Sequence, residues 1–195
     1  MADAVMQPKD VRTRREALGL GVALGCCSGA AWAQSPAPPR SQRPAAGDLL
    51  VSTKGGPDAA PLRPDDITTA APQVMAWAKD PASGTVRDGS RLNQILLLRF
   101  DPETLDAETL AHAAGGVLAF SATCTHAQCP VSEWRGEAGI LHCPCHGSEF
   151  DPRAGGKVVG GPAPRRLPPL PLRLTAEGGL EVAQPFVGKV GVQAA

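Results

Sequence analysis

The sequence predicts an all-β fold built from short antiparallel strands. Glycine (22 residues) and proline (20 residues) are both frequent, which favours a loop-rich β architecture over a helical bundle. Apolar residues fall in short runs between polar and turn-forming residues, as in Asn93–Phe100, and this pattern is typical of buried strands. A short helix is one interpretation of Leu105–Ala114, where Leu105, Thr109 and Leu110 lie roughly one turn apart, and an irregular loop is the alternative.

The predicted strands begin near Asp48–Val51, where a stretch rich in proline and alanine ends. In Gln73–Ala78 both alternating sets of residues are largely apolar, so we expect a strand that is covered on both faces. Gly115–Ser121 is expected to be a strand that leads into a cysteine-rich loop. Further strands are expected at Ile140–His142, Lys157–Gly161, Leu170–Leu174 and Leu180–Val182.

Length and charge limit the classes of function. The 195 residues have room for one domain of ordinary size plus tails. The 19 basic and 19 acidic residues balance, which argues against nucleic-acid binding and against a polybasic membrane patch. We divide the chain into a signal segment (1–33), a linker rich in proline and alanine (34–47) and a folded domain (48–190).

Residues 1–33 have the pattern of an export signal. Arg14 and Arg15 precede the uncharged, weakly apolar stretch 17–33, which ends in Ala31-Trp32-Ala33. The adjacent arginines resemble a twin-arginine signal. We therefore expect a periplasmic protein that is exported by the twin-arginine route and cleaved near Ala33.

Two alternatives remain for this segment. Residues 17–33 are shorter than the roughly 20 apolar residues of a spanning helix and contain four glycines, yet they could serve as an uncleaved anchor in the inner membrane. Leu24-Gly25-Cys26 also faintly resembles a lipoprotein cleavage site.

Two short motifs carry most of the chemical information: C-T-H-A-Q-C at Cys124–Cys129 and C-P-C-H-G-S at Cys143–Ser148. Each has one cysteine and one histidine at ligand spacing plus a second cysteine, and sixteen residues separate His126 from Cys143. Two thiolates and two imidazoles that converge on one point make a metal site. Structural zinc is one alternative, but zinc motifs usually pair cysteine with cysteine and histidine with histidine.

The motif pair resembles the Rieske iron–sulfur family, in which C-T-H-x-x-C and C-P-C-H-G-S are the paired cluster loops. The resemblance implies a Rieske-type antiparallel β sandwich with a small cluster-binding subdomain inserted, and it places the cluster loops within 121–152. It also implies a 2Fe-2S cluster and a disulfide, which would indicate an oxidising compartment. The implied roles are thiolate ligands at Cys124 and Cys143, imidazole ligands at His126 and His146, and a disulfide between Cys129 and Cys145.

The resemblance also implies residues that surround the cluster. Residues 160–168, with Gly161, Pro162 and Pro164, match the loop that shields the cluster, although a proline-rich turn with solvated arginines is the alternative. Ser148 would donate a hydrogen bond to a bridging sulfide. Phe150 stands where high-potential members have a tyrosine that bonds a ligand sulfur, so we expect a potential below the top of the Rieske range of about −150 to +300 mV.

These features predict one-electron transfer by a subunit without a catalytic site of its own. The expected partner is a cytochrome, a quinol-oxidising subunit or the large subunit of a molybdoenzyme. We consider three classes: the iron–sulfur subunit of a quinol–cytochrome c reductase, the small subunit of an arsenite oxidase-type molybdoenzyme, and a non-redox zinc-binding module.

Overall fold

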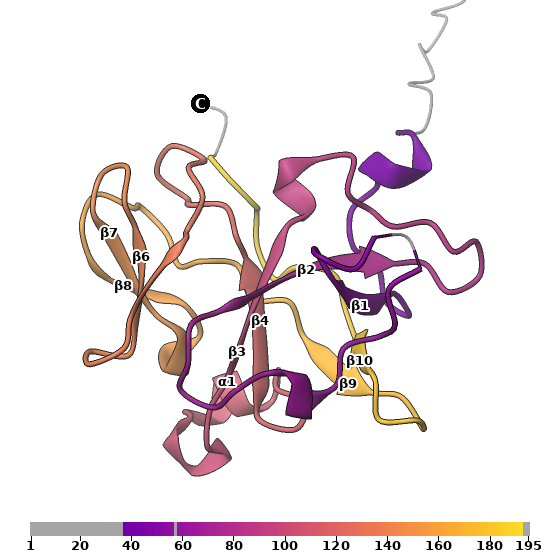
Figure 1. Cartoon of the computed structure of the whole chain (residues 1–195). Coiled ribbons are helices and arrows are strands. Elements are labelled where there is room, and N and C mark those ends of the chain that lie inside the picture. Colours follow the sequence, from indigo (N-terminus) through magenta and orange to yellow (C-terminus); the bar gives the residue numbers. More distant parts are fainter. Residues whose placement is uncertain (1–36, 57, 193–195) are drawn as a thin grey trace, which may run out of the picture. The chain divides into compact units, whose positions relative to one another are not determined.

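The computed structural model describes residues 37–56 and 58–192, and almost all regular structure in them is antiparallel β (Figure 1). The chain divides into two units, residues 1–35 and 36–195, and the described residues belong to the second. The expected export signal (1–33) lies outside the described residues. No helix within the described ranges is long and apolar enough to cross a membrane.

A six-stranded antiparallel sheet, with strand order β4-β3-β2-β1-β10-β9, forms the larger part of the fold. Its outer strand β4 meets the segment before β9, because Leu170 N donates to Ala119 O at 2.8 Å and Ser121 N donates to Pro168 O at 2.9 Å. The sheet is therefore nearly closed, closer to a barrel than to two separate layers. Its strands are β1 (Leu49–Ser52), β2 (Val74–Lys79), β3 (Ile95–Arg99), β4 (Val117–Ser121), β9 (Leu172–Leu174) and β10 (Leu180–Val182).

Strand β3 divides its side chains between two apolar cores. Ile95 and Leu97 belong to one core, and Leu96 and Leu98 belong to the other, as the two-residue period of a strand requires. All four are buried, as the short apolar run predicts. In β2 the expected covering of two faces is only partial: Ala76 and Ala78 are buried in the first core, whereas Met75 on the other face packs against the second core and is only partly buried.

A second, four-stranded sheet is inserted between β4 and β9, and its order is β5-β6-β7-β8. Figure 1 shows β6, β7 and β8 to one side of β3 and β4. This insertion confirms the predicted subdomain, and it carries the second motif between β6 and β7. The strands are β5 (Glu133–Arg135), β6 (Ile140–Cys143), β7 (Ser148–Asp151) and β8 (Lys157–Gly160).

Helical structure in the described part of the chain is limited to single turns. The helix considered for Leu105–Ala114 is reduced to α1 (Ala107–Leu110), which begins after Asp106, whose carboxylate accepts from Thr109 N at 2.7 Å. The 3₁₀ turns are Pro39–Ser41, Pro64–Asp66, Arg91–Asn93, Pro102–Thr104 and Pro152–Ala154.

Residues 37–47, which the sequence assigns to a linker, are bound to the domain. Arg40 donates two hydrogen bonds to Asp88, at 2.7 and 2.8 Å. Arg43 donates to Leu92 O at 2.6 Å. The arginine side chains thus hold this proline-rich segment against the domain. The folded domain therefore begins before Asp48.

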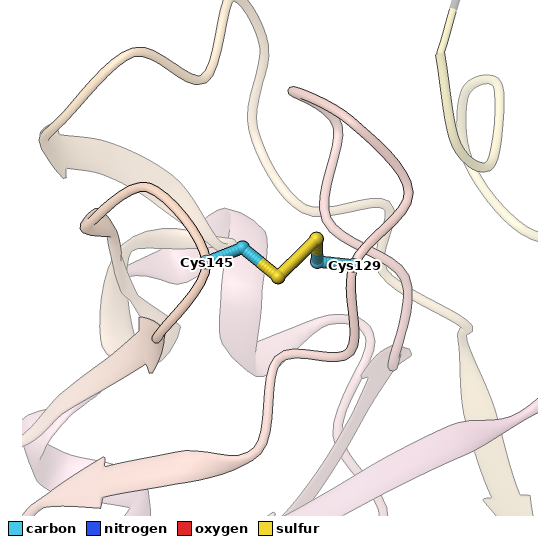
Figure 2. Close-up of a disulfide and its surroundings, with 2 residues drawn as sticks. All are labelled: Cys129 and Cys145. Carbon is cyan, nitrogen blue, oxygen red and sulfur yellow. A yellow bond between two sulfur atoms is a disulfide. The ribbon is translucent and has the colours of Figure 1, made fainter.

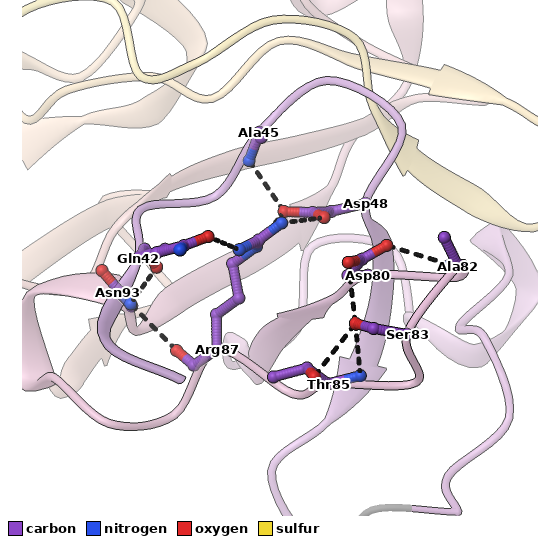
Figure 3. A network of polar contacts seen from close by, with 9 residues as sticks. All are labelled: Gln42, Ala45, Asp48, Asp80, Ala82, Ser83, Thr85, Arg87 and Asn93. Atoms are coloured by element: carbon purple, nitrogen blue, oxygen red, sulfur yellow. Dashed lines mark hydrogen bonds and ion pairs between the residues drawn. The ribbon is translucent and has the colours of Figure 1, made fainter. Parts of the chain in front are cut away.

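A buried ion pair fixes the end of this segment (Figure 3). Arg87 donates to both carboxylate oxygens of Asp48, at 2.6 and 2.9 Å, and both side chains are almost fully buried. The same carboxylate accepts from Ala45 N at 2.7 Å, and Arg87 also reaches Gln42 Oε1 at 3.1 Å. These bonds attach residues 42–48 to the segment that returns beside β2, where Arg87 N donates to Ala78 O at 2.8 Å.

Candidate metal centre

The first motif forms a closed loop directly after β4. Val131 N donates to Ala122 O at 2.9 Å, which ties the two ends of the loop together. Inside it, Cys124 N donates to Cys129 O at 2.8 Å. The loop therefore brings the first and last residues of the C-T-H-A-Q-C motif next to each other.

The second motif is the turn of the hairpin between β6 and β7. Cys143 ends β6 and is paired in register with Ser148, which begins β7. Gly147 N donates to Cys143 O at 3.0 Å, and Gly147 has a φ of +74°, a conformation that glycine adopts without strain. The hairpin geometry thus fixes Cys143 at its base and leaves residues 144–146 at its exposed tip.

A disulfide between Cys129 and Cys145 joins the two motif loops, as expected (Figure 2). The sulfur atoms of Cys129, Cys143 and Cys145 all lie within 4.8 Å of one another. Because two of these three sulfurs are bonded to each other, only the Cys143 thiol of this group is available as a metal ligand.

The other expected ligands gather from the same two loops. Within the described ranges, the free cysteines are Cys124 and Cys143, and each side chain is buried. The imidazole rings of His126 and His146 face each other edge-on, with centroids 4.7 Å apart. His146 is exposed and His126 is partly exposed, so the thiols lie inside the protein and the imidazoles lie toward its surface.

Burial raises the pKa of the Cys143 thiol above its ordinary value, although the backbone N–H of Cys145 opposes the shift. The neighbouring Cys124 thiol adds to the rise, because two thiolates side by side would repel each other. A bound cation removes this penalty, since it binds thiolates in preference to thiols.

Two buried polar atoms at this place have no hydrogen-bond partner among the described residues: Nδ1 of His126 and Oγ of Ser148. Buried polar atoms without partners are rare in folded proteins because each costs about 1–3 kcal/mol. A group that ligates the imidazole and accepts a bond from the hydroxyl would satisfy both atoms. Two thiols, two imidazoles and this hydroxyl therefore fit an iron–sulfur cluster.

Residues 160–168 lie against both motif loops. Thr125 Oγ1 donates to Arg165 O at 2.7 Å, which joins this segment to the first loop. Gly161 has a φ of +74°, and a Cβ there would lie 2.3 Å from Gly147 O, so only glycine permits this approach to the second loop. Pro162 and Pro164 are exposed on the outer side of the segment.

Other residues near the site have structural partners. Phe150 is completely buried and is paired with Leu141 and Val158 in the small sheet. His142 is paired through Nδ1 with Glu133 at 2.8 Å, so its ring already has a partner outside the two motif loops.

The contacts of Thr125 and Arg165 were missed at the sequence level. Thr125 could have been noticed from the sequence, because it stands between two expected ligands in the C-T-H motif. Arg165 gave no such local signal, since the acceptors of its guanidinium group lie 24 and 26 residues further along the chain.

The fold and the site together define a β protein with a candidate metal centre of two thiols and two imidazoles. Comparisons with known proteins identify its family. The model of the Rieske [2Fe-2S] domain matches residues 78–171. A cytochrome bc1 complex Rieske iron–sulfur subunit of Streptomyces lividans is 31% identical over 151 residues, which cover 74% of this chain and 85% of that protein. The chain belongs to the Rieske [2Fe-2S] family, and its cofactor is a 2Fe-2S cluster.

Two further proteins are similar over part of the chain. A Haloferax mediterranei protein described as a respiratory nitrate reductase Rieske subunit is 42% identical over 106 residues, which cover 54% of this chain and 47% of that protein. The chain thus spans about half the length of this relative. The plasma membrane Rieske protein PetC3 of Synechocystis PCC 6803 is 26% identical, with a TM-score of 0.36 over 55% of this chain and 84% of that one.

Proposed function

We propose that Cys124, Cys143, His126 and His146 hold the 2Fe-2S cluster and that the chain transfers single electrons. The observation that carries the proposal is the placement of two buried free thiols and two adjacent imidazoles on loops joined by a disulfide. When bound, the cluster supplies a centre that gains and loses one electron.

The residues around that centre have different roles. The buried thiolates carry negative charge, whereas neutral imidazoles do not, so the mixed set raises the potential above the value of about −400 mV typical of plant-type ferredoxins. The disulfide and residues 160–168, here called the third loop, limit the movement of the ligand loops. The exposed ring of His146 offers a short path to a partner and a nitrogen that can exchange a proton with solvent.

The proposed setting is a respiratory oxidoreductase of the quinol–cytochrome c reductase type, in which this chain is the electron-transfer subunit. The name of the Streptomyces lividans relative supports this setting. The second candidate is the small subunit of a molybdoenzyme of the arsenite oxidase type. The name of the Haloferax mediterranei relative, a respiratory nitrate reductase Rieske subunit, supports only a respiratory enzyme other than a quinol–cytochrome c reductase.

The proposed location is the periplasm, reached by the twin-arginine route, with either cleavage near Ala33 or an uncleaved segment 17–33 that anchors the chain in the inner membrane. Arg14-Arg15 and the uncharged stretch after them support this proposal. Intact-mass measurement of the exported protein distinguishes the two outcomes. A protein that stays in the cytoplasm would contradict the proposal.

The setting is tested by purification of the chain, tagged at its C-terminus, from its own cells under mild conditions. Haem absorption and quinol-dependent reduction of the cluster in the purified complex would support the quinol–cytochrome c reductase. Stoichiometric molybdenum without haem would support the second candidate. An isolated chain with neither cofactor would contradict both.

A further inference from the structure

The last described residues of the chain return to the metal centre. Residues 183–192, here called the C-terminal clasp, run beside the segment that follows the third loop. Ala183 N donates to Pro171 O at 2.8 Å, and Val187 N donates to Pro169 O at 2.9 Å. This course leads the clasp from the end of β10 toward the first motif loop.

Arg165 connects the clasp to that loop. Its guanidinium group donates to Lys189 O at 2.9 Å and to Gly191 O at 2.6 Å. Its own carbonyl oxygen accepts from Thr125 Oγ1 at 2.7 Å. One residue thus joins three segments that are far apart in the sequence, and Thr125 lies between two of the proposed ligands.

A second contact joins the clasp directly to the first loop, at the same Gly191 whose carbonyl oxygen accepts from Arg165. Gly191 is buried, and a Cβ built on it would lie 3.2 Å from Cγ and Cδ of Gln128, so the clasp packs against the Gln128 side chain. Gln128 has a φ of +59°, which residues other than glycine rarely adopt. Its contact with the clasp offers a physical reason for a side chain at a position where the backbone favours glycine.

We propose that the C-terminal clasp is a positioning element for the first motif loop and that Arg165 is the positioning residue through which it acts. Arg165 and Gln128 together hold the loop closed between the third loop and the clasp. The loop carries Cys124 and His126, so the clasp slows opening of that side of the cluster site; this consequence for the cluster rests on the ligand set proposed above.

Hydrogen exchange of the full chain tests the clasp directly. In Arg165→Ala, the amides of Cys124 and Gln128, which bond within the first loop, should exchange about tenfold faster or more, because hydrogen bonds from a charged donor are lost. The amides of Leu97 and Ala119 in the large sheet should be unchanged. An equal rise throughout the sheet would overturn the proposal in favour of a general loss of stability.

Matched variants separate position from charge. Arg166→Ala removes the same charge from the next residue, which is exposed and pairs with Glu108 instead of the clasp, so it should leave loop exchange unchanged. Arg165→Lys should restore part of the protection. Gly191→Ala keeps the Arg165 side chain but changes the other end of the contact: Gly191 has a φ of +75°, so a Cβ there strains the clasp backbone and disturbs both its packing on Gln128 and its bond to Arg165. This variant should also speed loop exchange.

Release of iron to a chelator supplies the second measurement. Arg165→Ala and Gly191→Ala should release iron faster than the Arg166→Ala control, in the same order as their loop exchange. Wild-type loop exchange in both clasp variants would overturn the proposal. Faster loop exchange in a protein without a 2Fe-2S spectrum would instead uphold the clasp and contradict the proposed ligands.

Discussion

Ser148 has a fully buried side chain whose hydroxyl oxygen finds no partner among the described residues. In the absence of a bound group, burial removes this hydroxyl from water and no hydrogen bond within the protein offsets that cost. Its position at the start of β7, in register with Cys143, places it beside a proposed ligand. A hydrogen bond from this hydroxyl to the cluster would offset the cost of its burial and would explain why a serine occupies the position.

Replacement of Ser148 should therefore affect the loaded and the empty protein in opposite ways. Ser148→Ala should lower the midpoint potential by tens of millivolts, since about 59 mV corresponds to a tenfold change for one electron. The free energy of unfolding of the protein without its cluster should stay the same or rise. Potentiometric titration and denaturant unfolding measure the two quantities. An unchanged potential would remove Ser148 from the surroundings of the cluster.

Phe150 offers a change in the opposite direction. Phe150→Tyr adds a hydroxyl at the position where the resemblance places a donor to a ligand sulfur, so the potential should rise by an amount on the order of tens of millivolts. The side chain is completely buried, so near-ultraviolet circular dichroism should first verify that the fold is retained. A potential that is unchanged or lower in the folded variant would mean that the hydroxyl does not reach the sulfur.

At the scale of elements, the disulfide joins two loops that different sheets position. The first loop follows β4 of the large sheet, and the second belongs to the β6–β7 hairpin of the small sheet. Cys129→Ala should lower the free energy of unfolding by about 2–5 kcal/mol, measured by denaturant titration without reductant. Pro144→Ala, at the exposed tip of the same hairpin, is the control and should have little effect. Free labelling of both bridge thiols in the wild-type protein would disprove the bond.

The bond between residues 42–48 and the sheet depends on a buried charge. Arg87→Met would leave the Asp48 carboxylate buried without its counter-ion, and this should cost about 3–5 kcal/mol of unfolding free energy. The double variant Asp48→Asn/Arg87→Met should recover part of this loss, because no charge is then left buried. Thermal or denaturant unfolding of the three proteins measures the difference. A cost below that of the exposed-pair control Arg40→Met would contradict the role of this ion pair.

At the scale of the whole molecule, local chemistry was predictable and long-range contacts were not. Each motif is a short stretch whose own backbone forms the loop or hairpin turn that holds its cysteines. The roles of Cys124 and Cys143 could therefore be predicted from spacing and resemblance. The docked segment at Arg40 and the clasp at Gly191 were not predicted, because their partners lie 48 residues away at Asp88 and 26 residues away at Arg165. Residues 34–47 were predicted to be a linker from their composition. Composition does not show that an arginine in this stretch forms hydrogen bonds with a distant part of the domain.

The central claim is that two imidazoles and two thiolates of the paired loops hold the 2Fe-2S cluster. Pulsed electron paramagnetic resonance of the reduced protein measures this directly through the couplings of ligand nitrogens. We predict two directly bound imidazole nitrogens in the wild-type protein and loss of the native signal in His126→Ala. A spectrum without nitrogen couplings, a native signal in His126→Ala, or stoichiometric zinc in place of iron would contradict the claim.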